Sequence, residues 1–223
     1  MTAREAILGK IRRSLGVTGE ELRRNATVDD RLTRAPKGII PARGQLPQAE
    51  RIALFAAMAG KVLATVERVA DEAAIPMTVA QYLRAHNLPA TLRMGDDPTL
   101  AGLAWSRTPI EVKRGPSDGT EAVGLSHAFA GVAETGTLVL ASGRDNPTTI
   151  NFLPETHIVV LKAEDIAGDY ETVWERLRAR YGRGVLPRTI NWITGPSRSG
   201  DIEQTILIGA HGPRRLHIIV VGD

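Results

Sequence analysis

Five side chains able to do polar chemistry lie in one short stretch near the C-terminus, ITGPSRSGDIEQTILIGAHGPRRL (residues 193–216). They are Ser197, Arg198, Asp201, Glu203 and His211. An apolar run ends here at a turn that begins with Gly195, and Ser197 and Arg198 follow at once. Arginine can hold an anion through two parallel hydrogen bonds, and amides exposed at a strand-to-helix turn also attract anions. We therefore expect Gly195, Ser197 and Arg198 to bind a small anionic ligand.

The two carboxylates of this stretch have two readings. Asp201 and Glu203 are two residues apart, so on an extended segment both would face the same side and join the ligand site. If Ser199 or Asp201 instead caps a helix, Asp201 is structural and Glu203 complements the helix dipole. The spacing of apolar residues in 201–209 suits a helix as well as a buried strand, so this choice stays open.

His211 lies in a constrained turn, AHGP, close in sequence to those carboxylates. A histidine in such a place could transfer protons near neutral pH, and we expect it to be catalytic. His157, which begins a strand after a proline-containing turn, could point into the same cleft, although a structural role is favoured. These two histidines with Asp201 and Glu203 could in principle hold a metal, but no H-x-x-x-H or similar spacing is present, and we predict no metal site.

A second polar turn, AETGTLVL, contains Glu134, Thr135, Gly136 and Thr137 between two apolar strands. Loops at strand ends are where α/β proteins place their ligands. Gly136 would let backbone amides approach a ligand, and Thr135 and Thr137 would add hydroxyl groups. Glu134 could then be a base or a nucleophile. The alternative, equally favoured, is a plain hairpin turn with an exposed glutamate.

The elements that position these turns alternate between helices and strands. Helices are expected from about 48 to 60 and from Pro76 onward, with a third that begins near Tyr170. Strands are expected at 62–69, 157–162, 188–194 and 215–223, and VGLSHAFAGVA and TGTLVLAS are apolar on both faces. Such strands lie in the middle of a sheet that helices cover, so the pattern predicts an α/β layered sheet. We expect the turns at 134–137, 195–197 and 211–213 to meet at one rim of this sheet.

The N-terminal segment reads differently from the rest of the chain. Residues 3–15 carry apolar residues at helical spacing, residues 18–34 are polar and charged, and residues 35–47 are rich in proline and glycine. This pattern is typical of an arm and an extended linker. We therefore divide the chain into an N-terminal helical arm and linker, 1–46, and an α/β domain, 47–223.

Composition excludes several classes of function. The 223 residues include no cysteine, so this chain cannot hold a disulfide, a thiolate zinc or an iron–sulfur cluster through its own thiolates. Its net charge is only +3 and aromatic residues make up 4%, so nucleic acid is an unlikely partner. We see no apolar run long enough for a membrane helix and no secretory signal, and we expect a cytoplasmic protein.

Three stretches carry a resemblance to a known family. GVAETGTLVL, FLPETHIVVL and ITGPSRSGDIEQTILIGAHGPRRLHIIVV resemble the lactate utilization protein C (LutC/YkgG) family, within the wider LUD-domain group, over roughly Ile52 to Val221. Where that family commonly has Thr-Ala, this chain has Ser199 and Gly200. The resemblance implies a fold like that of the NagB/RpiA/CoA-transferase superfamily, with a mostly parallel sheet and helices on both faces.

The same resemblance implies a role in the bacterial oxidation of L-lactate to pyruvate, together with two iron–sulfur partner proteins. The alternative is a stand-alone enzyme, similar to a CoA transferase or an isomerase, that acts on a small acyl or phosphorylated substrate. Some CoA transferases use the glutamate of an E-x-G turn as a nucleophile, and Glu134-Thr135-Gly136 is similar to that turn. The sequence identifies no cofactor, nor does it decide whether this chain is catalytic on its own.

Overall fold

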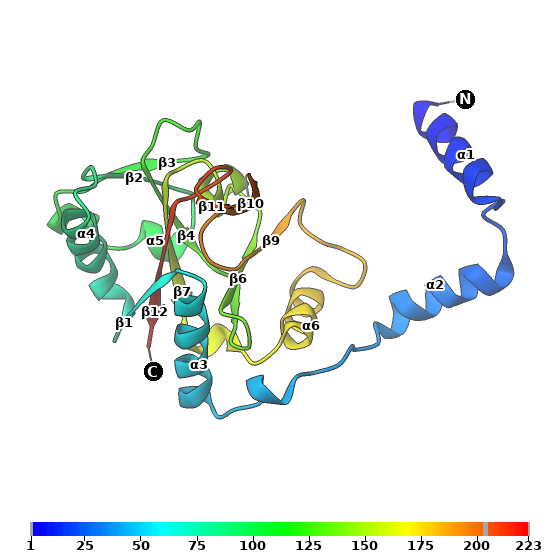
Figure 1. Ribbon diagram of the computed structural model, residues 1–223, viewed down its shortest axis with the longest axis horizontal. Coiled ribbons are helices and arrows are strands. Elements are labelled where there is room, and N and C mark those ends of the chain that lie inside the picture. Colours follow the sequence, from blue (N-terminus) through cyan, green and yellow to red (C-terminus); the bar gives the residue numbers. More distant parts are fainter. Residues whose placement is uncertain (1, 203–204, 223) are drawn as a thin grey trace.

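The computed structural model describes residues 2–202 and 205–222 (Figure 1). The helices are α1 (Ala3–Leu15), α2 (Leu22–Arg34), α3 (Gln48–Lys61), α4 (Ile75–Ala85), α5 (Pro98–Ala101) and α6 (Tyr170–Tyr181). The strands are β1 (Thr65–Val69), β2 (Thr91–Met94), β3 (Glu111–Arg114), β4 (Val123–His127), β5 (Ala130–Val132), β6 (Thr137–Ala141), β7 (Thr156–Lys162), β8 (Ile166–Ala167), β9 (Ile190–Ile193), β10 (Arg198–Ile202), β11 (Thr205–Ile208) and β12 (Arg215–Val221). The short 3-10 helix that matters for the site is η4 (Thr148–Asn151).

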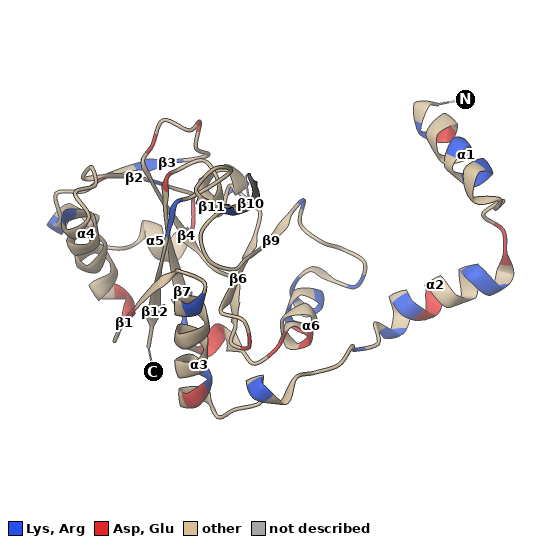
Figure 2. Ribbon diagram, in the orientation of Figure 1, with Lys and Arg blue, Asp and Glu red and all other residues tan. Residues whose placement is uncertain are grey.

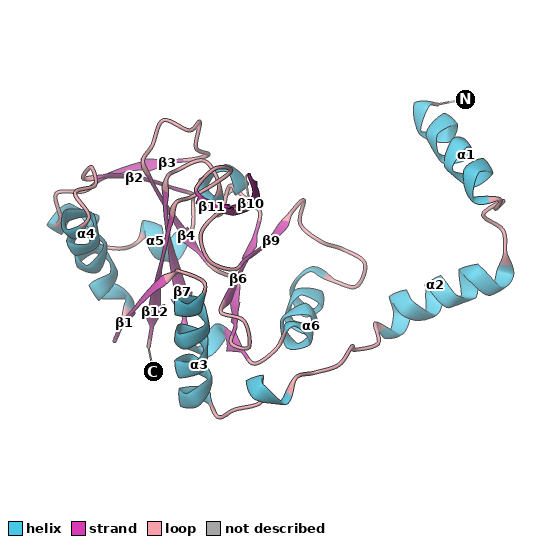
Figure 3. Ribbon diagram, in the orientation of Figure 1, coloured by secondary structure: helices cyan, strands magenta, loops and turns pink. Residues whose placement is uncertain are grey.

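A six-stranded parallel sheet forms the centre of the domain, with the strand order β1-β12-β7-β4-β2-β3 (Figure 3). The two central strands, β7 and β12, are buried along almost their whole length. Their sequences, THIVVLK and RLHIIVV, are nearly continuous apolar runs, as expected of strands covered on both faces. The predicted α/β fold with a parallel sheet is therefore confirmed.

The two faces of this sheet are covered differently. On one face, α4 and α5 pack against alternate residues of the sheet, among them Leu125, Ile158 and Ile219. On the other face, α3 packs against Val159 and Ile218, together with strands of a second sheet. Helices thus lie on both faces, and the second sheet shares one of those faces with α3.

The second sheet has four strands in the order β8-β5-β6-β9 and is mixed, because β6 is antiparallel to both of its neighbours. Helix α6 covers its outer face through Val173 and Leu177. The TGTLVLAS segment contributes β6 to this sheet rather than to the parallel one. Its apolar residues are buried on both faces all the same, because α3 and the parallel sheet lie on one side and α6 on the other.

Strands β10 and β11 pair with each other as a two-stranded antiparallel sheet of their own. The structure therefore decides the open choice for Asp201 in favour of a strand. Glu203 lies outside the described residues, and of Asp201 only its backbone in β10 is described. The apolar residues of β11 are exposed, with Ile206 at 68%. A buried strand, the other reading of this run, is thus not what forms.

The N-terminal helices α1 and α2 extend away from the domain, and neither buries a residue (Figure 1). The arm carries many more blue basic than red acidic segments in Figure 2, in keeping with its arginines. Contact with the domain begins where Arg183, in the loop after α6, donates a hydrogen bond to the carbonyl of Thr33. Lys37 then pairs with Glu175 of α6 at 2.7 Å. Among the described residues, no helix has the length and apolar character needed to cross a bilayer.

Candidate functional site

A cavity of about 260 Å³ lies at the amino ends of β7 and β12. It is lined by two of the turns that the sequence singled out, Gly195 to Arg198 and His211 to Pro213. The remaining lining residues are Asn151, Phe152, His157, Trp192, Ile193 and Leu216. The structure therefore brings Gly195, Ser197, Arg198 and His211 to one place, as the sequence predicted, although their roles there remain proposals.

Backbone hydrogen bonds hold the two turns together. The amide of Ser197 donates to the carbonyl of Pro213 at 2.9 Å, and the carbonyl of Ser197 accepts from Gly209 at 2.8 Å. The amide of Ser197 is thus not free for an anion, contrary to one element of our expectation. Anion binding here would depend on side chains instead. Arg198 and His211 both line the cavity and are exposed, and we call this pair the cavity mouth.

Asn151 and His157 form what we call the cavity floor. They are 1% and 0% exposed, and both side chains meet one buried serine. The hydroxyl of Ser126 donates to Oδ1 of Asn151 at 3.0 Å, and Nε2 of His157 lies 3.0 Å from the same oxygen. Because the only hydroxyl proton points at Asn151, Ser126 accepts a hydrogen bond from His157. Nε2 of His157 therefore carries a proton.

Two polar atoms of the cavity floor are left over. Nδ1 of His157 and Nδ2 of Asn151 are buried and have no hydrogen-bond partner in the described part of the chain. An unpaired buried donor or acceptor typically costs about 1–3 kcal/mol. Burial lowers the pKa of His157 from 6.5 to about 3, so its imidazole is neutral near pH 7 and Nδ1 presents a bare lone pair. Both atoms are closed off from solvent, so neither is exposed on the surface of the cavity.

A glycine on β4 lets η4 close over the sheet and bring Asn151 to this place. A side chain on Gly124 would lie 2.8 Å from the carbonyl oxygen of Ile150 and 3.0 Å from Pro154. Both distances are closer than side-chain carbons normally approach, so a larger residue would push η4 outward. The position of the cavity floor therefore depends on close contact between this turn and β4.

The turn at residues 134–137 lies near the cavity but does not line it. Thr137 is fully buried, and its hydroxyl lies 2.7 Å from the hydroxyls of both Thr135 and Thr194. Tyr170 joins the same cluster, 3.0 Å from Thr135 and 2.9 Å from Thr137. Since Thr194 directly precedes Gly195, the hydroxyl cluster connects this turn to the cavity wall. Only two of the three turns surround the cavity itself, which differs from the single rim that we expected.

Glu134 contacts the linker and does not line the cavity. Its carboxylate lies 3.8 Å from Nε of Arg43, and its amide donates to the carbonyl of Gly168 at 3.2 Å. The side chain is 5% exposed, so the simple reading of an exposed hairpin glutamate does not hold. No contact joins Glu134 to His211 in the described structure, and the two residues predicted as catalytic are thus in different surroundings.

The C-terminal end of α3 supports both turns. Gly136 has φ +68°, and a side chain there would lie 2.2 Å from the amide of Ala59. Gly195 has φ +75°, and a side chain there would lie 2.2 Å from the carbonyl of Val62. Left-handed backbone and direct backbone contact both require glycine. Gly136 therefore serves packing here, whatever further role the turn has.

His157, His211, Asp201 and Glu203 are the residues that could in principle hold a metal. Within residues 2–202 and 205–222, no three His, Asp or Glu side chains gather as a metal-binding group would. Glu203 lies outside that range, and the side chain of Asp201 is not described. His157 has Ser126 as its neighbour, so the described part of this set supplies no metal geometry.

Comparisons with known proteins define the class. The model of the LUD domain family matches residues 52–221, which is 170 of the 223 residues, and the chain belongs to this family. It is 37% identical over 102 residues to "Lactate utilization protein C" of Geobacillus sp. (strain WCH70), and 36% identical over 102 residues to the protein of that name in Bacillus subtilis (strain 168). Each match covers 45% of this chain and 42% of the relative, so the similarity spans less than half of these proteins. The predicted resemblance is confirmed.

The fold has a solved counterpart. The crystal structure of a DUF162 family protein from Deinococcus radiodurans superposes with a TM-score of 0.60 and 25% sequence identity. The match covers 79% of this chain and 99% of that chain. Almost the whole of that protein is therefore accounted for, while about a fifth of the present chain has no counterpart in it.

Sequence reasoning missed the two hydrogen-bonding partners on the cavity floor, Asn151 and Ser126. One signal was available for Asn151, since an amide between the apolar residues Ile150 and Phe152 is well placed to be buried. Ser126 lies inside a strand-like apolar run and carried no comparable signal. The sequence allowed two interpretations of His157, a structural histidine and a residue of the cleft. In the structure His157 is buried, and it is also one of the residues that line the cavity.

Proposed function

We propose that this protein is a component of bacterial L-lactate utilization that binds a small carboxylate in the cavity between the two turns. The observation that carries the proposal is that Arg198 and His211 both line the mouth of this cavity, in a member of the LUD family whose relatives are named for lactate utilization. A guanidinium is well suited to a carboxylate, and a cavity of about 260 Å³ is small enough to favour a small acid.

Iron–sulfur proteins would be the partners in this proposal, and the reaction would be the oxidation of L-lactate to pyruvate in the cytoplasm. The chain has no cysteine, so the electrons would pass to clusters held by those partners. The exposed arm, with its apolar residues Ile7, Ile11 and Leu15 uncovered, offers a surface on which they could dock. The share of the reaction that falls to this chain is binding of the acid.

Growth provides the test of the cellular role. A strain that lacks the gene should fail to grow on L-lactate as sole carbon source, and a plasmid copy should restore growth. A copy that encodes Arg198→Met should restore it poorly, although the protein accumulates to the normal level. Normal growth of the deletion strain, in a background without another lactate oxidase, would refute the proposal.

The alternative is a stand-alone enzyme, similar to a CoA transferase or an isomerase, with Glu134 as the nucleophile. The almost complete burial of Glu134 beside Arg43 supports a special role for this carboxylate. A nucleophile must contact its substrate, however, and Glu134 does not line the cavity. A screen of CoA esters and sugar phosphates with the wild type and Glu134→Gln decides the matter, since turnover that disappears in the variant would favour this alternative.

A further inference from the structure

Another cavity, of about 350 Å³, lies where the arm reaches the domain, and we call it the arm cavity. Three arginines line it, Arg31 of α2, Arg178 of α6 and Arg183 of the loop after α6, and we call them the arginine cluster. Arg31 and Arg183 are exposed and Arg178 is half-buried, so a dissolved ion can reach the cluster. None of the described lining residues is an acid. The others are Leu32, Ala35, Pro36 and Gly184.

The arginine cluster has no acidic partner in the part of the chain that the structure describes. Arg183 donates to the carbonyl of Thr33 and keeps further N–H groups for another acceptor. The side chains of Arg31 and Arg178 have neither a hydrogen bond nor an ion pair among the described residues. Asp29 is two residues from Arg31, and residues at that spacing do not face each other on a helix. The three positive charges therefore repel one another in a shared cavity.

The carboxylates next to the cluster along the chain are engaged with other cations. Asp30 pairs with Arg34 through two hydrogen bonds, and Glu175 pairs with Lys37. The loop after α6, residues 182–189, contains no acid. These segments thus leave the countercharge of the cluster to be supplied by something else.

Helix dipoles explain only part of this arrangement. Arg31 and Arg178 lie in the last turns of α2 and α6, where a positive charge interacts favourably with the helix end. Arg180 lies in the same last turn as Arg178, yet it lines a different cavity. Arg183 belongs to no helix. The dipoles therefore account neither for Arg183 nor for the convergence of three side chains on one cavity.

Three guanidinium groups suit a phosphate-type anion better than a carboxylate. A carboxylate is planar and pairs well with one guanidinium fork, whereas the oxygens of a phosphate point in several directions and can meet several forks. Each phosphate group also carries up to about two negative charges near neutral pH. A diphosphate group can therefore offset the charge of the whole cluster.

We propose that the arginine cluster binds a diphosphate group, either free or carried by a nucleotide, and that the bound anion holds α2 against the domain. Arg31 belongs to the arm, while Arg178 and Arg183 belong to the domain, so one ligand connects the two parts of the chain (Figure 1). The arm cavity shares no lining residue with the cavity at the amino ends of β7 and β12. The inference is therefore independent of the proposed carboxylate site.

Calorimetric titration of the full chain at pH 7 and constant ionic strength, with pyrophosphate, ADP and sulfate, tests the ligand class. We expect pyrophosphate to bind about ten-fold more tightly than sulfate, because it makes additional charge-assisted hydrogen bonds. Tighter binding of ADP than of pyrophosphate would support a nucleotide as the source of the diphosphate, and equal binding would support the diphosphate group alone. The inference is overturned if neither binds, or if sulfate binds as tightly as pyrophosphate.

Single substitutions in the cluster test the site. Arg31→Met, Arg178→Met and Arg183→Met should each weaken pyrophosphate binding about ten-fold or more, the usual effect of losing a hydrogen bond to a charged group. Arg180→Met is the matched control, because it removes the same charge from the same last turn as Arg178→Met. Its affinity should equal that of the wild type. Equal losses in Arg178→Met and Arg180→Met would show a general effect of charge and would contradict a defined site.

Arg198→Met separates this inference from the proposed function. If Arg198→Met loses affinity for pyrophosphate while Arg31→Met keeps it, the anion binds in the other cavity and the present inference fails. If Arg31→Met loses pyrophosphate affinity while carboxylate binding stays normal, the arm cavity is supported whatever the fate of the carboxylate site.

Hydrogen–deuterium exchange of the wild type gives a readout that needs no substitution. Pyrophosphate should slow amide exchange in the last turn of α2, because the anion ties Arg31 to the domain. Binding of pyrophosphate without any change in the exchange of α2 would show that the arm takes no part, and the inference would be rejected.

Discussion

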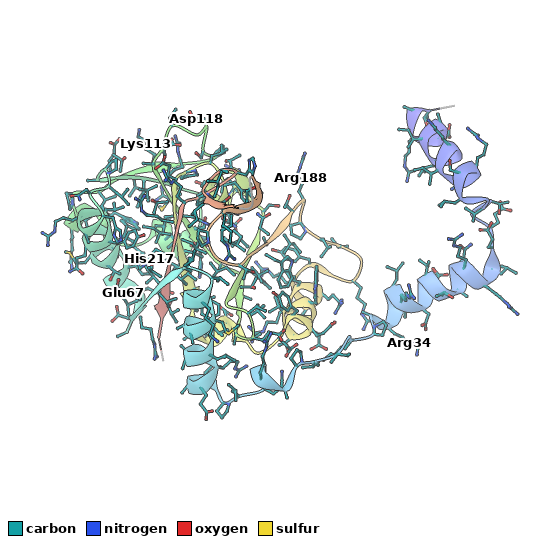
Figure 4. All side chains as sticks on the ribbon, viewed as in Figure 1. Arg34, Glu67, Lys113, Asp118, Arg188 and His217 are labelled. Carbon is teal, nitrogen blue, oxygen red and sulfur yellow. The ribbon has the colours of Figure 1, made fainter. Side chains whose placement is uncertain are left out.

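At the scale of single residues, the molecule holds two histidines in its interior without a charge. Burial lowers the pKa of His157 to about 3, and it lowers the pKa of His217 to about 4, with a smaller contribution from the charge of His86. His217 stacks on Tyr82 with ring centroids 4.0 Å apart. Figure 4 shows it next to Glu67 of the adjacent strand, with 3.7 Å between Nε2 and the nearer carboxylate oxygen. That carboxylate is half exposed and does not offset the cost of burying a charged ring.

These two histidines make stability depend on pH. Between the lowered pKa values and 6.5, the unfolded chain binds protons that the folded chain excludes, so stability falls as the pH is lowered through this range. We expect the free energy of unfolding to drop by about 4 kcal/mol from pH 7 to pH 5, measured by urea denaturation. The carboxylates with lowered pKa values, such as Asp97 and Asp169, contribute mainly below this range.

The control for this prediction is His217→Gln, which should lose about half of the pH dependence because only His157 then remains. A midpoint of denaturation that stays constant from pH 7 to pH 5 would show that neither ring is excluded from protonation. That result would also remove the basis for a bare Nδ1 at the cavity floor.

Arg198 is the residue on which the anion site depends. Its side chain is exposed at the cavity mouth, and no ion pair joins it to the described residues. We expect Arg198→Met to weaken the binding of small carboxylates about ten-fold or more, without a change in thermal stability. Arg188→Met, on the exposed loop before β9, is a matched control and should have no effect on either quantity. Equal binding by Arg198→Met would place the anion elsewhere.

The individual residues also show what a sequence can and cannot reveal. Arg198, Ser197 and His211 could be recognised because polar residues next to glycine and proline stand out. Their meeting in space could be anticipated from the positions of the turns at strand ends. The hydrogen bond between Ser126 and Asn151 could not, since it joins β4 to η4 through a register that depends on Gly124 having no side chain.

At the scale of elements, glycine at two turns fixes how the site is assembled. We expect Gly195→Ala to destabilise the protein by about 2 kcal/mol or more, because a methyl group would overlap the carbonyl of Val62 and the backbone is left-handed. Gly184→Ala is the control: its φ is +72°, but nothing lies within 4 Å of the added carbon. It should cost only the backbone term, about 1 kcal/mol. Thermal unfolding of the two variants measures the difference, and equal costs would mean that the contact with Val62 relaxes freely.

The pairing of β10 with β11 alone explains why residues 201–209 could not be assigned from the sequence. A strand that pairs with only one other strand and exposes its apolar side chains has neither the alternation of a half-buried strand nor the continuous burial of a central one. Ile206, Leu207 and Ile208 are 68%, 42% and 42% exposed, so this strand matches neither of those two patterns. By contrast, β7 and β12 were predictable because their burial on both faces leaves a continuous apolar run.

At the scale of the whole molecule, the arm contributes little to the stability of the domain. No residue of α1 or α2 is buried, and the family match begins only at residue 52. We expect a protein that lacks residues 1–34 to unfold within about 2 °C of the full chain and to bind carboxylates equally well. Differential scanning calorimetry checks the first point. A loss of several degrees would mean that the arm packs on the domain in solution.

The overall architecture was predictable to the level of an α/β fold, and the division into two sheets was not. Alternating helices and buried strands indicate layers, but they do not say which strands pair. β6 and β7 are both mostly apolar and buried, yet one lies in a mixed sheet and the other at the centre of the parallel sheet. Pairing between strands that are distant in the sequence decides which sheet a strand joins. The sequence of one strand does not identify the strand beside it.

Helix α3 meets both polar turns through bare main chain, at Ala59 and at Val62. Side chains absorb small movements by changing rotamer, whereas peptide groups in direct contact cannot. A shift of α3 along its axis would therefore be passed on to the cavity wall at Gly195, which contacts Val62. The C-terminal end of the helix that directly follows the linker therefore helps to hold one wall of the cavity in place.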